Sequence, residues 1–349
     1  MSGSTYIVSP QSNDQTVSEP SSVSTTFLDF VRRDLEAVEA RMNADLGSDV
    51  RTVYALTRHI LNAGGKRLRP AMVALSARAA APDANVNEER LATVGAAVEF
   101  VHMATLVHDD VVDNTATRRG KPTANAIFGN GVAVLSGDYI LARAMRLLAI
   151  DGDLDIIRTV SEITVEMSEG EVMEISATGK FDLSQEEYLE ILRKKTAVFV
   201  EGCCRCGAKV ANAEPAIEEA LADYGCSLGM AFQLADDLLD YTGDPDITGK
   251  PRGTDLRDGR ATLPFLLALD AANETEQTDL LRAFGNPSTD DTEVLHCCDI
   301  MAKYDTFDRT RDAARDHVDR AEAALALLPS STARDCFLAL TDYVVQRDR

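Results

Sequence analysis

Apolar residues recur along the chain at the spacing of a helix. From Phe27 to Met42 they fall three, four or seven positions apart, which places them on one face of a helix. Ser184 opens a capping box, which predicts a helix that runs to about residue 212. Pro215 then lies near the first turn of a helix that should reach about Tyr241. Because no convincing run of strict apolar and polar alternation is present, the pattern predicts an all-α fold.

The first 26 residues have a different composition from the rest of the chain. They are rich in Ser and Thr, and they have neither the basic start nor the apolar core of a secretory signal. Such a composition is typical of disorder, so we expect residues 1–26 to form a disordered tail. We interpret residues 27–349 as one helical domain.

The charge balance excludes one large class of proteins. The 349 residues include 35 basic and 57 acidic side chains, which gives a formal net charge of −22. Such a charge repels nucleic acid, so we do not expect sequence-independent DNA or RNA binding. No stretch reaches the roughly 18 consecutive apolar residues of a membrane span. Seven cysteines, an odd number, without an export signal indicate reduced thiols and a cytoplasmic protein.

The pattern Asp-Asp-x-x-Asp occurs twice. Its copies are Asp109–Asp113 and Asp236–Asp240, and each lies near the end of an apolar helix, just before a loop that contains Gly or Pro. Residues four apart share a helix face, and carboxylates placed so close together repel one another unless cations neutralise them. Such oxygen ligands favour Mg²⁺, which carboxylates commonly hold together with substrate phosphates. One copy alone could be a solvated acidic surface, but two copies flanked by apolar turns favour a metal site.

Lysine is scarce in this chain and is concentrated near the acidic motifs. Of the 35 basic residues only eight are lysine, and five of these eight lie in short basic segments. The segments are Gly64–Pro70, Arg118–Pro122, Arg193–Thr196, Gly249–Gly253 and Arg257–Arg260. Because Lys and Arg bind phosphate, this allocation predicts a substrate with several phosphate charges. The Walker-type phosphate loop, the His-Glu-x-x-His zinc motif and the Gly-x-Ser-x-Gly elbow are all absent from the sequence.

Taken in order, these motifs resemble the trans-isoprenyl diphosphate synthases, also called polyprenyl synthetases. The matching segments are Gly-Gly-Lys-Arg-Leu-Arg-Pro at 64–70, Glu-Phe-Val-His at 99–102, the first acidic motif with 118–123, Lys195-Thr196, 232–235 with the second acidic motif, and 249–264. The resemblance covers about residues 27–349. It implies an isoprenoid synthase-type helical bundle around a central cavity.

The resemblance implies a Mg²⁺-dependent prenyltransferase that condenses isopentenyl diphosphate with an allylic diphosphate. The metal would act as a Lewis acid on the leaving diphosphate, so that the C–O bond ionises to an allylic carbocation. The double bond of isopentenyl diphosphate would attack this cation, and loss of a proton would leave a chain five carbons longer. A homodimer and a cytoplasmic location also fit this family.

Site residues carry over from the family position by position. Mg²⁺ would be bound by Asp109, Asp113 and Asp236, with Asp110, Asp237 and Asp240 as further ligands or supports. Isopentenyl diphosphate would be held by Lys66, Arg69, His102 and Arg119. The allylic diphosphate would be held by Arg118, Lys195, Thr196, Gln233 and Lys250, with Arg260 where the family often has a lysine. The expected catalytic residues are Asp109, Asp113, Asp236, Lys195 and Lys250.

Product length depends on what lies below the first acidic motif. Ala104 precedes Asp109 by five residues, about 7.5 Å along a helix at 1.5 Å per residue. A bulky aromatic at this position resembles the floor of family members that stop at fifteen or twenty carbons, whereas Ala104 and Thr105 leave a tunnel open. The segment Gly170–Met173 also resembles the long-chain members. We therefore expect more than twenty carbons; a geranylgeranyl diphosphate synthase is the alternative, with Met167 or Met173 as a deeper floor.

Three other functions fit the sequence less well. A terpene cyclase usually has an Asn/Ser/Glu-type second metal motif and lacks the cations at Lys66 and Arg69. A non-catalytic partner subunit of a heteromeric synthase should have degraded acidic motifs, and both motifs here are intact. An acidic helical scaffold without a ligand leaves the clustered lysines unexplained.

Overall fold

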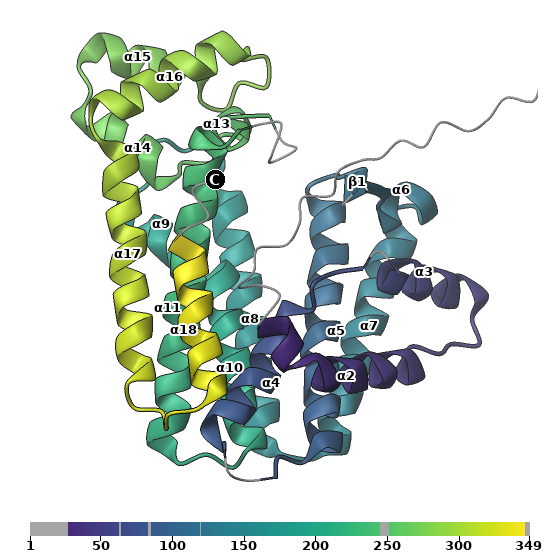
Figure 1. The fold of residues 1–349 in the computed structure, drawn as a ribbon. Coiled ribbons are helices and arrows are strands. Elements are labelled where there is room, and N and C mark those ends of the chain that lie inside the picture. Colours follow the sequence, from purple (N-terminus) through teal and green to yellow (C-terminus); the bar gives the residue numbers. More distant parts are fainter. Residues whose placement is uncertain (1–26, 63, 83–84, 119, 245–250, 346–349) are drawn as a thin grey trace, which may run out of the picture.

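Long helices that run up and down the molecule make up most of the fold (Figure 1). A computed structural model describes residues 27–62, 64–82, 85–118, 120–244 and 251–345. The expected tail, residues 1–26, lies outside the described residues. The all-α prediction is confirmed: within the described ranges, the β-structure consists of one two-stranded hairpin.

Within the described residues, the first half of the chain contains the helices α2 to α7 and the hairpin. They are α2 (Arg32–Asp45), α3 (Arg51–Asn62), α4 (Leu68–Ala80), α5 (Glu88–Val112), β1 (Thr117–Arg118), β2 (Lys121–Pro122), α6 (Ala124–Phe128) and α7 (Asn130–Asp151). The hairpin follows the first acidic motif directly, and Arg118 pairs with Lys121 in its antiparallel register.

The second half supplies the remaining helices of the described residues. They are α8 (Leu154–Ala177), α9 (Gln185–Leu192), the π-helical turn η1 (Arg193–Ala197), α10 (Val198–Val210), α11 (Pro215–Thr242), α13 (Thr254–Asp258), α14 (Leu263–Ala271), α15 (Glu274–Ala283), α16 (Asp291–Lys303), α17 (Thr306–Leu325) and α18 (Thr332–Val345). In Figure 1, α14, α15 and α16 cover one end of the bundle beside α13.

Two helix starts agree with the sequence signals. Ser184 caps α9 through a complete capping box. Its hydroxyl accepts a hydrogen bond from the backbone N–H of Glu187, and the Glu187 carboxylate accepts one from the backbone N–H of Ser184. Pro215 lies in the first turn of α11, which runs to Thr242. The helix expected from Ser184 to about residue 212 is present, but η1 interrupts it at Arg193–Ala197.

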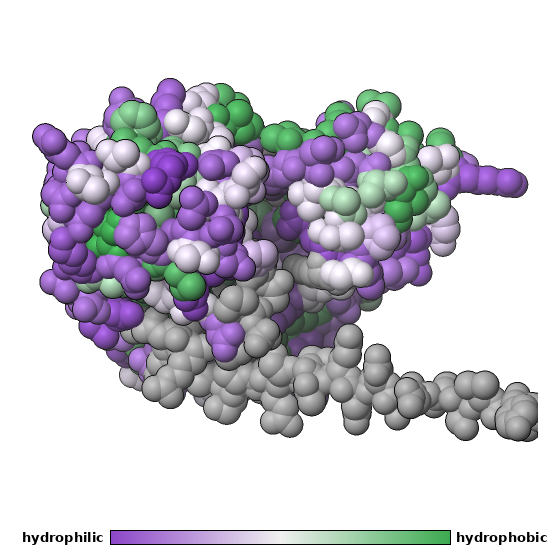
Figure 2. All heavy atoms as spheres, turned by 90° about the horizontal axis from the view of Figure 1, so that it is seen from above, coloured by the Kyte–Doolittle hydropathy of each residue, from purple (hydrophilic) through white to green (hydrophobic). Residues whose placement is uncertain are grey.

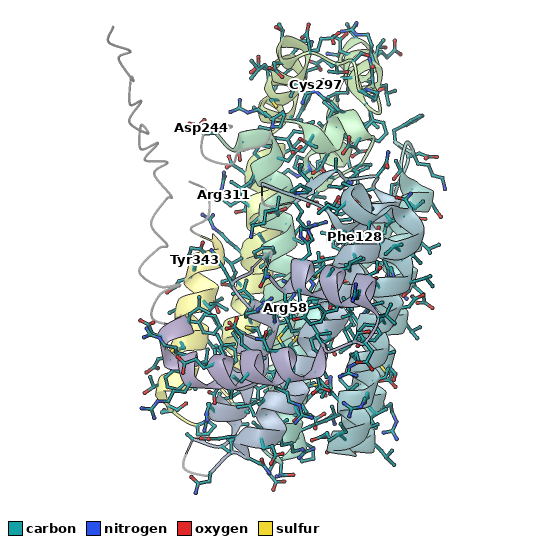
Figure 3. All side chains as sticks on the ribbon, turned by 90° about the vertical axis from the view of Figure 1, so that its right-hand side faces the viewer. Arg58, Phe128, Asp244, Cys297, Arg311 and Tyr343 are labelled. Carbon is teal, nitrogen blue, oxygen red and sulfur yellow. The ribbon has the colours of Figure 1, made fainter. Side chains whose placement is uncertain are left out.

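The apolar core consists of two large clusters. The larger one joins α4, α5, α7, α10 and α11, and the second lies under the end formed by α14, α15 and α16. Cys203, Cys204 and Cys206 are fully buried in the first cluster, while Cys297, labelled in Figure 3, belongs to the second. Burying each large apolar side chain stabilises the fold by about 1.5–3 kcal/mol. The cysteines therefore contribute to helix packing.

The helix α5 lies at the centre of the larger cluster. Among the described helices, it is the one whose length and hydropathy would suffice to cross a membrane. However, 78% of its most apolar window is buried inside the protein. The surrounding helices therefore account for its apolar composition, as in the core helix of a bundle.

Both acidic motifs lie at the same end of the bundle. The helix α5 ends next to the hairpin and α11 ends next to α13, and Figure 1 shows both at the top. Seen from above in Figure 2, a hollow separates the two halves of the molecule at this end. The fold thus brings together motifs that are 127 residues apart in the sequence (236 − 109).

Candidate active site

Three of the six motif carboxylates are bound by protein donors. Arg118 donates to Asp110 at 2.8 Å, which ties the hairpin to the end of α5. Tyr188 donates its hydroxyl to Asp237 at 2.6 Å. Asp240 accepts the backbone N–H groups of Thr254 and Asp255, at 3.1 and 3.0 Å, and so fixes the start of α13. These three carboxylates connect the ends of α5 and α11 to the surrounding elements.

The other three motif carboxylates, Asp109, Asp113 and Asp236, are more accessible. Asp113 and Asp236 are exposed and Asp109 is half-buried. Burial, followed by the negative charges of Glu171 and Asp113, raises the pKa of Asp109 to about 7. Across the described residues, no three His, Cys, Asp or Glu side chains already form a metal-binding group. Oxygen donors with so much uncompensated charge fit a hard cation whose remaining ligands come from a substrate.

Two cavities adjoin the acidic motifs, and the larger of these two, of about 720 Å³, lies beside the second motif. Its walls include Lys195, Gln233, Asp236 and Arg260, all predicted from the sequence. Thr196 donates to the side-chain oxygen of Gln233 at 3.2 Å, and Gln233 donates to Asp237 at 2.9 Å. The structure therefore brings the described members of the predicted allylic site together around one space, except Arg118, which lines the smaller cavity.

The larger cavity also contains acidic residues that the sequence analysis missed. Asp255 lies on its wall, and burial together with the charge of Asp240 raises the pKa of Asp255. Glu174 lies there too and binds the ammonium of Lys195, to which Glu171 is also bound at 3.2 Å. Asp255 falls within the matching segment 249–264, where only the basic residues had been considered.

The charged side chains of the smaller cavity, of about 500 Å³, are mostly basic. Its walls include Lys66, Arg69, His102, Arg118 and Lys121. All five belong to the basic segments or the His motif of the sequence analysis, so the structure gathers two segments that lie about 50 residues apart in the chain. Such a concentration of cations suits a diphosphate. Arg119 and Lys250, also predicted to bind substrate, lie outside the described residues.

Aromatic and acidic side chains hold this basic wall in place. The Arg69 guanidinium lies 5.7 Å from the centre of the Phe199 ring, and the His102 ring lies 6.0 Å from the same ring. Arg67, which has a left-handed backbone (φ 51°), donates to the buried Glu99 at 2.9 Å. The sequence analysis did not assign roles to Phe199, Arg67 or Glu99.

The hairpin and α3 are connected across the smaller cavity. Lys121 donates its ammonium to the backbone oxygen of Asn62 at 2.7 Å. The His59 Nε2 is 2.9 Å from the backbone oxygen of Pro122, and its ring lies edge-on to Phe128. Phe128 is labelled in Figure 3 on the side of the bundle where α3 and α6 lie. His59 also lines the cavity, so α3 supplies part of its wall.

The π-helical turn η1 positions Lys195 and Thr196. A π-helical turn accommodates an extra residue, and such turns are frequent at functional sites. Gly170 of α8 and Gly229 of α11 face this turn. A Cβ on Gly170 would lie 2.7 Å from the backbone nitrogen of Lys195, and a Cβ on Gly229 would lie 2.6 Å from the Cα of Ala197. Two helices without side chains at these points therefore hold η1 between them.

Comparison with known proteins agrees with this site. The family model described as "Polyprenyl synthetase" matches residues 50–301. Octaprenyl diphosphate synthase of Escherichia coli (strain K12) is 37% identical over 92% of this chain and 98% of its own length. A decaprenyl diphosphate synthase from Rhodobacter capsulatus has a TM-score of 0.87 at 35% identity, covering 93% of this chain and 99% of its own.

A further solved structure contains bound ligands. It is a polyprenyl synthase from Caulobacter crescentus complexed with calcium and isoprenyl diphosphate, with a TM-score of 0.85 at 37% identity, covering 93% of this chain and 98% of its own. The chain belongs to the polyprenyl synthetase family and is a transferase with the helical fold of that family.

Proposed function

We propose that this enzyme condenses isopentenyl diphosphate with an allylic diphosphate, and that its trans-polyprenyl product is longer than twenty carbons. The observation that carries the reaction is that Asp109 interacts electrostatically with a cation of each cavity. The positive charges of Lys195 in the larger cavity and of Arg118 in the smaller one favour the ionised form of its carboxylate. Asp109 would therefore help to hold a metal that would act as a Lewis acid on the allylic diphosphate.

Each cavity receives one substrate in this proposal. The smaller cavity, with Lys66, Arg69 and His102, holds isopentenyl diphosphate. The larger cavity, with Lys195, Gln233 and Arg260, holds the allylic diphosphate. Asp109, Asp113 and Asp236 bind Mg²⁺, which when bound stabilises the charge of the leaving diphosphate. Asp110, Asp237 and Asp240 keep the ligand-bearing helix ends and the loops beside them in place.

The proposed product length rests on Ala104. It lies in α5 one and a half turns below Asp109, and its side chain is only 1% exposed. A methyl group at this depth leaves more space for a growing chain than an aromatic ring would. The long-chain names of the similar proteins, octaprenyl and decaprenyl diphosphate synthase, support the same conclusion.

The test is to measure the products of the wild type and of Ala104 variants. With Mg²⁺, labelled isopentenyl diphosphate and farnesyl diphosphate, we expect wild-type products beyond twenty carbons. Ala104→Phe should shorten them to about twenty carbons or fewer, and Ala104→Val should shorten them less, because the added volume rises stepwise. A wild-type stop at twenty carbons would instead indicate a geranylgeranyl diphosphate synthase. No incorporation by folded, Mg²⁺-loaded protein would contradict the reaction and favour the partner-subunit alternative.

His59 should contribute selectively to the smaller cavity. Removing its contact with Pro122 in His59→Ala loosens β2, which carries Lys121 of the smaller cavity, so we expect the KM for isopentenyl diphosphate to rise about tenfold. The KM for the allylic substrate should change little, and His59→Gln should restore most of the affinity, since its amide can donate to the same carbonyl. Steady-state kinetics with each substrate varied in turn measures both. Equal increases of the two KM values would contradict this role.

We further propose that the enzyme is a homodimer that works in the cytoplasm. Apolar side chains of α7 and α8 face outward, including Leu135 at 69%, Leu154 at 72% and Val172 at 62% exposure. Exposed apolar side chains repeated along two neighbouring helices are typical of surfaces that another subunit covers. All seven cysteines are free, which suits a reducing compartment. Sedimentation at assay concentrations measures the oligomeric state, and a monomer would contradict this proposal.

A further inference from the structure

Three consecutive cations of η1 are matched by carboxylates of the neighbouring helix α8. Arg193 donates to Glu166 at 2.5 Å, Lys194 is bound to Glu169, and Lys195 is bound to Glu174 and Glu171. We call this set the α8–η1 ion-pair ladder. Two of its three steps, at Arg193 and Lys194, do not reach the larger cavity, whereas Lys195 and Glu174 both line its wall.

The Lys195 step is also the one that the proposed substrate must use. The Lys195 side chain is 31% exposed and that of Glu174 is 23% exposed, so a ligand in the cavity can reach both. Glu174 also raises the pKa of Arg260, the second cation of this cavity. A single carboxylate therefore faces two of the cations that are expected to hold the allylic diphosphate, Lys195 and Arg260.

We propose that Glu174 is an internal counterion that the allylic diphosphate displaces from Lys195, and that it thereby sets the affinity of this subsite. The inference rests on the proposed function, because it takes Lys195 as a ligand of the allylic diphosphate. Before substrate binds, the carboxylate of Glu174 forms an ion pair with the Lys195 ammonium. On binding, Lys195 exchanges this carboxylate for a diphosphate oxygen, and Glu174 loses a charge-assisted hydrogen bond. The observed binding free energy of the allylic diphosphate is therefore the difference between the Lys195–diphosphate interaction and the Lys195–Glu174 interaction.

Neutralising Glu174 should consequently tighten binding. In Glu174→Gln the amide has the shape of the carboxylate but no charge, so Lys195 keeps only the longer ion pair with Glu171, at 3.2 Å, and exchanges less carboxylate charge for the ligand. We expect the Kd for inorganic diphosphate in the presence of Mg²⁺ to fall about fivefold or more, as measured by titration calorimetry on the full chain. The KM for the allylic substrate should fall in parallel, while the KM for isopentenyl diphosphate stays unchanged.

The ladder itself provides a matched control. Glu169→Gln removes the same kind of charge from the same helix, at the step that pairs with Lys194 outside the cavity. We expect its Kd and both of its KM values to equal those of the wild type. A second test uses Lys195→Met: if Glu174 acts through Lys195, adding Glu174→Gln to Lys195→Met should produce no tightening.

The outcomes separate this inference from the proposed function. Equal Kd values for Glu174→Gln and Glu169→Gln, or weaker binding in Glu174→Gln, would overturn the counterion role while the wild type still elongates prenyl chains. Tightening that persists in the Lys195→Met background would overturn it as well. A wild type that neither binds Mg²⁺ and diphosphate nor incorporates isopentenyl diphosphate would contradict the proposed function itself.

Discussion

Asp109→Asn should abolish most of the activity and, in the absence of metal, make the protein more stable. The amide is a poor metal ligand, so loss of the metal that stabilises the leaving diphosphate should lower kcat/KM on the order of a thousandfold. The wild-type carboxylate is half-buried and lies near Glu171 and Asp113, whose charges oppose its ionisation. Removing its charge relieves that repulsion, which should raise Tm by about 1 to 3 °C at pH 8.

The pH dependence of this effect has a defined sign. The pKa of Asp109 is about 7 in the folded protein and returns to its ordinary 3.8 on unfolding. Between these values the folded state binds more protons than the unfolded state, so this group lowers stability as pH rises from about 4 to 7. Asp109→Asn lacks this contribution. The difference in Tm between this variant and the wild type should therefore increase from pH 5 to pH 8.

Thermal unfolding at both pH values, with a chelator present, measures this difference. Asp319→Asn is the matched control, because Asp319 is exposed on α17 and lines neither of the two cavities. Its activity and Tm should match the wild type. Unchanged activity in Asp109→Asn would remove this carboxylate from the metal site, and a lower Tm at pH 8 would contradict the repulsion that raises its pKa.

Gly170→Ala should inactivate the enzyme through the backbone of η1. The added Cβ would lie 2.7 Å from the Lys195 nitrogen and 2.8 Å from the Lys194 Cβ, closer than atoms of a folded protein pack. The turn must therefore move away from α8, and Lys195 and Thr196 move with it. A displacement of about 1 Å at a reacting centre can cost a hundredfold in rate, so we expect at least about that loss in kcat. Overpacking should also destabilise the fold by about 1–3 kcal/mol.

Gly131→Ala is the control for this prediction. Gly131 is also helical, but a Cβ added there meets nothing within 4 Å. This variant should keep full activity and be as stable as the wild type or slightly more so. Kinetics below the Tm of both variants separates displacement from unfolding. If Gly170→Ala were as active as Gly131→Ala, then the spacing between α8 and η1 would not determine where Lys195 lies.

Helix positions were predictable because they depend on local sequence. The capping box at Ser184 and the proline at 215 each fix a helix start through neighbouring residues. The π-helical turn was not predictable in this way. It is held by contacts with Gly170 and Gly229, which lie in other helices, and one inserted residue leaves the apolar periodicity almost unchanged.

The sequence predicted which charged residues belong to the candidate site, but it did not predict which of them are bound to other parts of the protein and which are accessible. The motif Asp-Asp-x-x-Asp identifies six carboxylates without showing which are available. Asp237 is bound by Tyr188, 49 residues away in the sequence, and Asp240 is bound by backbone N–H groups at the start of α13. Glu174 meets Lys195 because α8 packs against η1. Such pairings arise only when the helices are assembled.

The placement of both acidic motifs at the carboxyl ends of helices has a consequence for local order. The backbone dipoles of a helix leave partial negative charge at its carboxyl end, which favours cations and disfavours carboxylates there. The last turn of α5 together with its C-cap nevertheless contains Asp109–Asp113, and the last two turns of α11 contain Asp236–Asp240. The more accessible carboxylates, Asp109 and Asp113 at the end of α5 and Asp236 in α11, therefore oppose ordering of these turns until a cation neutralises them. When one of these helix ends frays, its carboxylates lose the arrangement that would bind a metal. Binding of a metal would in turn order the helix end, so fraying and metal binding oppose each other.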